Sequence, residues 1–164
     1  MSGIIAVFGE TESSEDLDPL IEKVKFRGKR CDCEIEEKDC SMTVLGGDLQ
    51  EEDNGLPLAV DGYLVYSEEN GETLQGVEGL EQFCKQLKRE GLSCFKNIEG
   101  EFALAFSDGN GRCLMARDPL GVKPLYYTLQ GDTLYIASEI KALIDLDSQI
   151  KEVPPGCYYD RKKG

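Results

Sequence analysis

Ser2 carries a hydroxyl that could act as a nucleophile if a neighbouring base removed its proton. The chain contains no histidine, so a Ser-His-Asp or Cys-His relay is impossible. The usual zinc hydrolase sites, which need histidine ligands, are excluded for the same reason. Any catalytic base must therefore be a carboxylate, a lysine or the amino group of the first residue.

Three cysteines in an acidic segment could also carry chemistry, because they are spaced as Cys31-x-Cys33-x₆-Cys40. Three thiolates could bind a soft metal ion, but the segment lacks a paired Cys-x-x-Cys and a nearby fourth ligand. We therefore expect no metal site and no cofactor. The remaining cysteines of apolar stretches are expected in the core, namely Cys84, Cys94 and Cys113.

Length and charge limit the other possibilities. With 164 residues, the chain is expected to form a single domain spanning residues 1–164. Its net charge of −14 makes nucleic acid and anionic membrane surfaces poor partners. No apolar run reaches the roughly 18 residues of a membrane span. Seven cysteines without a secretory signal indicate free thiols and a cytoplasmic location.

Two amphipathic helices and a third, shorter one are expected to position these residues. The first runs from Asp16 to about Lys25 and is closed by Gly28, and the second covers Val77–Arg89 and stops at Gly91. Ser138 is expected to cap a short helix that ends at Leu143.

Short apolar runs between glycine-rich or polar turns predict a series of strands. Asp61-Gly62 is a turn signal behind one of these runs, although the same dipeptide could have another role. Helices combined with many short strands indicate a layered α+β protein. The predicted strands are Ile4–Phe8, Met42–Leu45, Leu56–Val60, Phe102–Phe106, Cys113–Ala116, Leu125–Leu129, Leu134–Ala137 and a last one near Tyr158.

The run from Ala116 to Tyr127, ARDPLGVKPLYY, followed by Ala137–Leu143, ASEIKAL, is the most specific motif of the chain. It resembles the late strand segment of class II glutamine amidotransferases, in the version found in the N-terminal glutaminase domain of glutamine-dependent asparagine synthetase. Further similarity lies in Phe26-Arg27-Gly28, Val60–Tyr66, Ile98–Ala105 and Pro155-Gly156. The resemblance extends to about Tyr159 and implies the αββα four-layer sandwich of the N-terminal-nucleophile (Ntn) hydrolases.

The resemblance also implies where a catalytic site would lie. The family's nucleophile is a cysteine directly after the initiator methionine, whereas this chain has Ser2. Ser2 could act in its place after removal of Met1, it could be an ordinary chain start, or it could be an engineered replacement. The family's oxyanion hole uses an asparagine side chain and the next glycine N–H, and these positions hold Asp61 and Gly62. A carboxylate there offers no donor and repels the developing oxyanion.

The implied substrate contacts are only partly kept. Arg27 matches the arginine that grips the glutamine α-carboxylate, although it could equally be a surface ion-pair partner. Tyr63 stands where the family has a glutamate, and the aspartate that holds the α-amine falls at about Gly79, or at Glu78 if the alignment slips by one.

Together these features predict a stand-alone glutamine amidotransferase-like domain that has lost its chemistry and acts as a binding or regulatory subunit. No synthetase domain and no Ser-Gly-Gly-x-Asp-Ser pyrophosphate loop is found in the sequence, so the expected partner is a separate synthetase subunit. Two alternatives stay open. One is an active amidohydrolase with Ser2 as nucleophile, which would hydrolyse glutamine, and the other is a sensor in which Arg27 binds an amino acid or small carboxylate.

Overall fold

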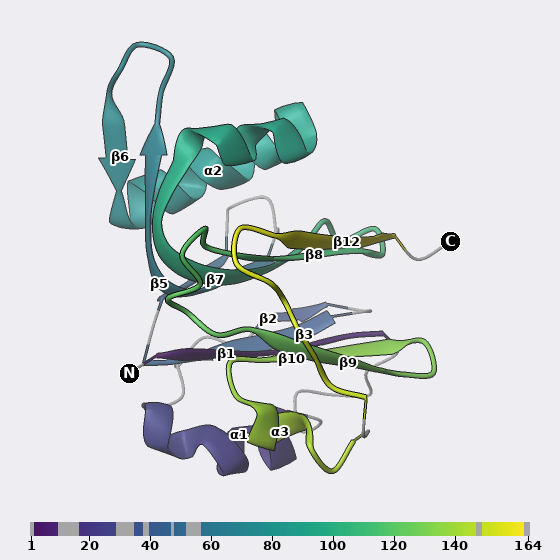
Figure 1. Cartoon of the computed structure of the whole chain (residues 1–164). Coiled ribbons are helices and arrows are strands. Elements are labelled where there is room, and N and C mark those ends of the chain that lie inside the picture. The colour runs from purple at the N-terminus through teal and green to yellow at the C-terminus, as the bar shows by residue number, and fades with distance from the viewer. Residues whose placement is uncertain are drawn as a thin grey trace.

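A computed structural model describes residues 2–9, 17–28, 35–37, 40–46, 48–51, 57–146 and 149–162. Two antiparallel sheets stack face to face (Figure 1). Within the described residues, the strand order of the first sheet is β11 (Lys151–Glu152), β9 (Tyr126–Gln130), β10 (Thr133–Ala137), β1 (Gly3–Phe8), β3 (Cys40–Leu45) and β2 (Ile35–Glu37). The order of the second is β12 (Tyr158–Lys162), β8 (Arg112–Arg117), β7 (Ile98–Ser107), β5 (Pro57–Ser67) and β4 (Asp48–Glu51), and β6 (Thr73–Gln75) pairs with β5.

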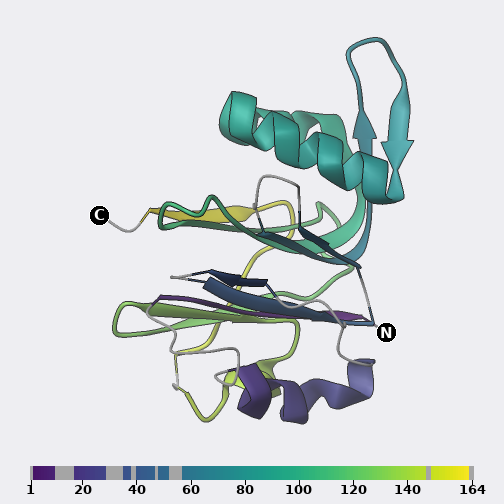
Figure 2. The ribbon, with the colours of Figure 1, turned by 180° about the vertical axis from the view of Figure 1, so that it is seen from behind.

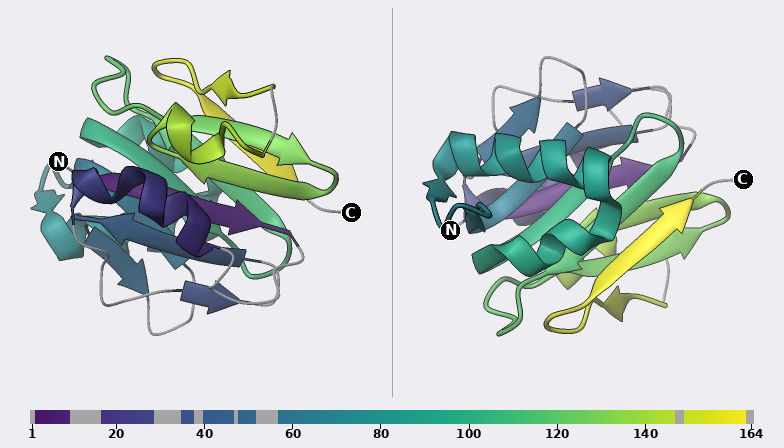
Figure 3. Two further views of the ribbon diagram at one scale, coloured as in Figure 1. Left: turned by 90° about the horizontal axis from the view of Figure 1, so that it is seen from below. Right: turned by 90° about the horizontal axis from the view of Figure 1, so that it is seen from above.

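Helices cover the outer face of each sheet (Figure 3). The first sheet is covered by α1 (Asp18–Val24) and α3 (Ile140–Leu143), and a short 3₁₀ turn, η2 (Lys25–Arg27), continues from α1. The second sheet is covered by α2 (Gly76–Glu90) and by η3 (Gly91–Asn97), as the view from behind also shows (Figure 2). The four layers are helix, sheet, sheet and helix, which confirms the predicted α+β sandwich.

Strand β1 is buried on both faces, as its continuous apolar run predicts. Successive strand residues point to opposite faces. Ile4, Ala6 and Phe8 pack into the layer between the two sheets, whereas Ile5 and Val7 pack under α1 and α3. The start of the chain is therefore held in the middle of the molecule.

The apolar face of α2 packs on the second sheet as its spacing predicts. Phe83 and Cys84 are fully buried and meet Leu58 and Phe102 in one cluster. Burial raises the pKa of the Cys94 thiol to about 11 and does the same for Cys113. These cysteines are free thiols in the core, as expected. None of the helices in the described ranges is long and apolar enough to cross a membrane.

The prediction of a turn at Asp61-Gly62 is wrong. Both residues lie inside the eleven-residue strand β5, where Asp61 pairs with Ala103 and Gly62 with Phe102 of β7. The glycine bends the strand instead of ending it. Its φ is 113°, and a Cβ there would lie 1.9 Å from the Glu101 carbonyl oxygen, so only glycine fits.

The prediction of Ser138 as a helix cap is also wrong. Glu139 is the N-cap of α3, and no side chain caps it. The Ser138 hydroxyl instead accepts a hydrogen bond from the backbone N–H of Ile4 at 2.9 Å. Sequence reasoning failed here because a serine before a helix has the local pattern of a cap whatever it contacts elsewhere. The predicted starts at Asp16 and Leu56 lie outside the described residues, as do Cys31 and Cys33.

Candidate functional site

The fold brings together Ser2, Arg27 and Asp61, three of the residues predicted at the site. Ser2 precedes β1, Arg27 ends η2, and Asp61 lies in the middle of β5 on the other sheet. The Ser2 hydroxyl donates a hydrogen bond to Asp61 Oδ1. The Ser2 carbonyl oxygen accepts one from Arg27 Nη1 at 2.6 Å. The site therefore lies where β1 of the first sheet meets β5 of the second.

Asp61 is the centre of this site. Its side chain is 0% exposed, and a buried carboxylate persists as an anion only if charges and hydrogen bonds compensate for the lost water. Lys123 Nζ lies 3.2 Å from Oδ1. The Ser138 hydroxyl donates to Oδ2 at 3.3 Å, and Arg27 Nη1 lies 3.6 Å from the same oxygen. Each carboxylate oxygen of Asp61 thus contacts at least one hydrogen-bond donor or cation of the site.

The Arg27 guanidinium also forms several hydrogen bonds and ion pairs. Its Nε donates to Glu139 Oε1 at 2.8 Å, and its Nη2 lies 2.7 Å from that oxygen. Its side chain is 11% exposed. The guanidinium therefore divides its donors between Glu139, Asp61 and the Ser2 carbonyl. Arg27 is therefore a partly buried ion-pair partner of Glu139 and Asp61.

Lys123 lies in the loop between β8 and β9, and hydrogen bonds hold the backbone of this loop. Asp118, which is fully buried, accepts backbone N–H groups from Leu120, Val122 and Lys123 at 3.0–3.1 Å. Arg117 donates from Nε to the Lys123 carbonyl oxygen at 2.7 Å. The Arg-Asp pair of the motif thus fixes the backbone that carries the lysine.

Sequence reasoning missed three residues of the site: Lys123, Ser138 and Glu139. All three lie inside the motif that carries the resemblance, but no local pattern indicates their contacts with Asp61 or Arg27. With Asp61 and Arg27 they form a network of two carboxylates, Asp61 and Glu139, and two cations, Arg27 and Lys123. Among the described residues, the positive and negative charges of this network balance.

Comparison with known proteins identifies the family. The sequence model of a family described as "Glutamine amidotransferase domain" matches residues 64–145, half of the chain. The chain belongs to the glutamine amidotransferase domain family. The matched region contains Lys123, Ser138 and Glu139, and the other residues of the site lie before it.

Among curated proteins, this glutamine amidotransferase domain is similar to glutamine-hydrolysing asparagine synthetases. It is 30% identical to a probable asparagine synthetase of Schizosaccharomyces pombe over 68% of this chain and 22% of that protein. It is 29% identical to the asparagine synthetase of Sandersonia aurantiaca over 100% of this chain and 35% of that protein. The chain therefore spans about a third or less of the length of these relatives.

Solved structures support the same fold. The glutamine phosphoribosylpyrophosphate amidotransferase of Bacillus subtilis, in complex with ADP and GMP, superposes with a TM-score of 0.64 at 16% identity, over 98% of this chain and 49% of that one. The glutamine amidotransferase domain described here therefore has the Ntn-hydrolase sandwich that the resemblance implied.

The other predicted positions do not join the network. Tyr63 follows Gly62 on β5 and is 56% exposed. Glu78 is exposed and Gly79 is buried in the first turns of α2, and within the described residues no hydrogen bond or ion pair links either to Ser2, Arg27 or Asp61. A Cβ at Gly79 would lie 2.7 Å from the Leu74 carbonyl oxygen, so the local packing excludes an aspartate there.

The cysteine segment lies mostly outside the described residues. Cys40 is buried in β3, and Cys31 and Cys33 lie outside the described residues. Among the residues that the structure describes, no group of three cysteines or carboxylates is arranged to hold a metal ion.

The chemistry open to the network follows from its donors and acceptors. The Ser2 hydroxyl contacts the Asp61 carboxylate, which also pairs with Lys123 and Arg27. The oxygen of a tetrahedral intermediate at Ser2 would find the Asp61 carboxylate where an N–H donor is required.

Proposed function

We propose that this glutamine amidotransferase domain has lost glutamine hydrolysis and acts as a binding or regulatory domain. The observation that carries the proposal is the fully buried Asp61, whose carboxylate contacts the Ser2 hydroxyl and the cations Arg27 and Lys123. In the resemblance, Asp61 occupies the oxyanion-hole position.

Electrostatics supports the loss of activity. Removing one oxyanion-hole donor typically lowers kcat by about 10²–10³, and a carboxylate adds repulsion to the missing donor. The nucleophile position adds a second obstacle, because a serine hydroxyl ionises far less readily than a thiol with a pKa of about 8.5. Arg27, the proposed carboxylate clamp, already pairs with Glu139.

The proposed partner is a synthetase subunit. The relatives are named as glutamine-hydrolysing asparagine synthetases, and this chain matches only 22% and 35% of their length in the two cases given above. A domain without glutaminase chemistry would contribute contacts to such a partner instead of ammonia.

A first experiment measures glutamate release from L-glutamine by the purified protein, whose intact mass shows whether Met1 is retained. Wild type, Ser2→Ala and Ser2→Cys are expected to stay at background, because Asp61 is present in all three. The double variant Ser2→Cys/Asp61→Asn, which restores a thiol and an amide donor, is expected to exceed Ser2→Cys. Glutamate release by wild type that disappears in Ser2→Ala would contradict the proposal.

One observation favours a second candidate function. The hydrogen bond from the Ser2 hydroxyl to Asp61 pairs a nucleophile with a carboxylate, so an amidohydrolase with Ser2 as nucleophile after removal of Met1 has a structural basis. It predicts a mass lower by one methionine and covalent labelling of Ser2 by an electrophilic glutamine analogue. Labelling that persists in Ser2→Ala would rule out this candidate.

A further inference from the structure

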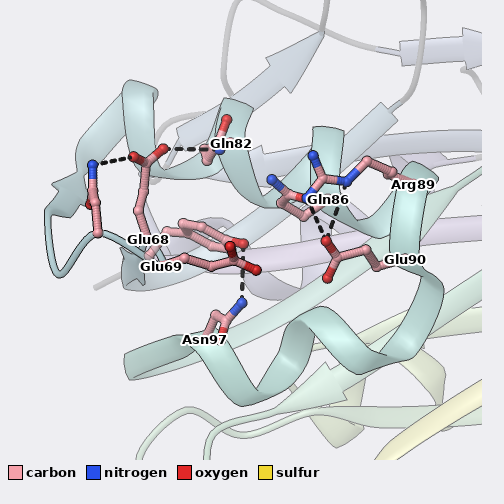
Figure 4. Close-up of a pocket in the computed structure, with 9 residues that line it drawn as sticks. Glu68, Glu69, Gln82, Gln86, Arg89, Glu90 and Asn97 are labelled. Atoms are coloured by element: carbon pink, nitrogen blue, oxygen red, sulfur yellow. Dashed lines mark hydrogen bonds and ion pairs between the residues drawn. The ribbon is translucent and has the colours of Figure 1, made fainter.

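A separate cavity lies on the outer side of the second sheet, between the β5–β6 turn, α2 and η3 (Figure 4). Its volume is about 260 Å³. It shares no residue with the network around Asp61. The cavity is lined by Tyr66, Glu68, Glu69, Asn70, Gln82, Gln86, Arg89, Glu90 and Asn97.

The donors around this cavity are mostly in use. Glu68 accepts from Gln82 Nε2 at 3.0 Å and from Asn70 Nδ2 at 3.3 Å. Arg89 Nε donates to Glu90 at 3.2 Å, and its Nη2 lies 2.5 Å from the same oxygen. With three carboxylates and one guanidinium, the formal charge of the lining is −2.

Acceptors remain without donors. Gln86 is 8% exposed, and its Oε1 is buried with no hydrogen-bond partner. Glu69 is exposed and accepts no hydrogen bond from the described residues, although its charge acts on Arg89. Figure 4 shows Gln86 on the part of α2 that borders the cavity, between Gln82 and Arg89. A buried acceptor is normally paired, so Gln86 Oε1 lacks a donor that the described residues do not supply.

We propose that this cavity binds an organic cation through an ammonium group. Such a group brings several N–H donors and a positive charge, which match the unpaired oxygen of Gln86, the exposed carboxylate of Glu69 and the net negative lining. A metal ion fits less well, because no group of three acidic or cysteine side chains in the described ranges is arranged to hold one. The chain's net charge of −14 also attracts a cation toward the surface.

Calorimetric titration of the full chain with cadaverine and with N-acetyl-lysine methylamide tests the proposal. Cadaverine carries an ammonium at each end of its pentyl chain and represents a free small amine. N-acetyl-lysine methylamide carries a single ammonium and represents a lysine side chain of a partner protein. The matched ligands without a cation are 1-pentanol and glutarate. Saturable binding of at least one amine, weakened by added NaCl, is expected, and neither matched ligand should bind.

Two variants link binding to this cavity. Glu69→Gln and Gln86→Leu are each expected to weaken amine binding by about tenfold. Gln86→Leu should leave the Tm of the ligand-free protein unchanged or higher, because it removes an unpaired buried acceptor. The control is Glu81→Gln, which removes a charge from α2 outside the lining, and it should change binding by less than about twofold.

The outcomes separate clearly. Tighter binding of cadaverine assigns the cavity to a small amine, and tighter binding of the capped lysine assigns it to a protein side chain. Binding of neither amine overturns the proposal, as does equal binding of 1-pentanol or glutarate. Equal weakening by Glu81→Gln and Glu69→Gln would also overturn it, because the attraction would then come from net charge alone.

Discussion

At the scale of single residues, the residue at position 61 determines the charge at the centre of the site. Asparagine and aspartate have nearly the same shape, but only aspartate brings a charge that must be neutralised when buried. The structure neutralises it with Lys123 at 3.2 Å and Arg27 at 3.6 Å. Both cations are thus paired with a carboxylate of the protein.

Asp61→Asn tests this directly. It is expected to lower the free energy of unfolding by about 1–3 kcal/mol, because Arg27 and Lys123 lose a buried partner. It should also free these cations for a small carboxylate. Thermal unfolding with a panel of amino and keto acids is therefore expected to be unchanged for wild type and to shift upward for the variant, since a ligand of the folded state raises Tm.

The control for this variant is Glu99→Gln on the exposed part of β7, which removes the same charge and should change stability by less than about 0.5 kcal/mol. A Tm increase of the wild-type protein with glutamate or another acid would favour the carboxylate-sensor reading. If no acid raises the Tm of either protein, Asp61 is not what prevents Arg27 from binding a ligand.

At the scale of elements, the bend in β5 and β7 determines where Asp61 faces. Gly62 in β5 and Gly100 in β7 have φ values of 113° and 138°, and each approaches a carbonyl oxygen of the other strand. Beyond the bend, β5 rises with β6 beside α2, as Figure 1 shows. The same strand thus serves both the network at Asp61 and the outer cavity at Tyr66.

Gly62→Ala is expected to destabilise the protein by about 4 kcal/mol or more, because its Cβ would overlap the Glu101 carbonyl oxygen and φ is unfavourable. Gly131→Ala is the matched control. Gly131 also has a positive φ, 60°, but a Cβ there meets nothing within 4 Å, so the cost should stay near 1–2 kcal/mol, about that of the conformation alone. Urea unfolding compares the two, and equal losses would contradict the steric explanation.

The loop between β8 and β9 gives a second test at this scale. In Asp118→Asn, one carboxylate oxygen becomes an NH₂ group that faces a backbone N–H, so one of the three hydrogen bonds is lost. The expected cost is about 1–3 kcal/mol by chemical denaturation. Asp132→Asn is the control, because the Asp132 side chain is 93% exposed. If both variants lose equal stability, the buried bonds of Asp118 are not what holds the loop.

At the scale of the whole molecule, the net charge of −14 acts on stability as well as on partners. Unscreened repulsion among like charges opposes the compact state, and salt reduces it. We expect Tm to rise between 20 and 300 mM NaCl, by about 2–4 °C if screening contributes about 1 kcal/mol. A fall in Tm over this range would mean that surface ion pairs, such as Arg112 with Asp160 at 2.8 Å, outweigh the repulsion.

The family, the layered α+β class and most of the helices and strands could be predicted from the amino-acid sequence. Their signals are local: the continuous apolar run of β1, the spacing of Leu80, Phe83 and Leu87 on α2, and the motif from Ala116 to Tyr127. Each depends on residues a few positions apart, which is the range over which strand alternation and helical periodicity act. The sequence also identified Ser2, Arg27 and Asp61 as positions of interest, through the family resemblance.

The contacts between these residues could not be predicted from the sequence. Ser2 and Asp61 are 59 positions apart, and Ser138 and Asp61 are 77 apart. Contacts at such separations depend on how the two sheets pair and stack, which no local pattern specifies. For the same reason, the turn predicted at Asp61-Gly62 became the middle of β5, and the expected cap at Ser138 became a partner of Asp61. At both positions, contacts with the buried Asp61 carboxylate and its strand outweigh the local preference for a turn or a helix cap.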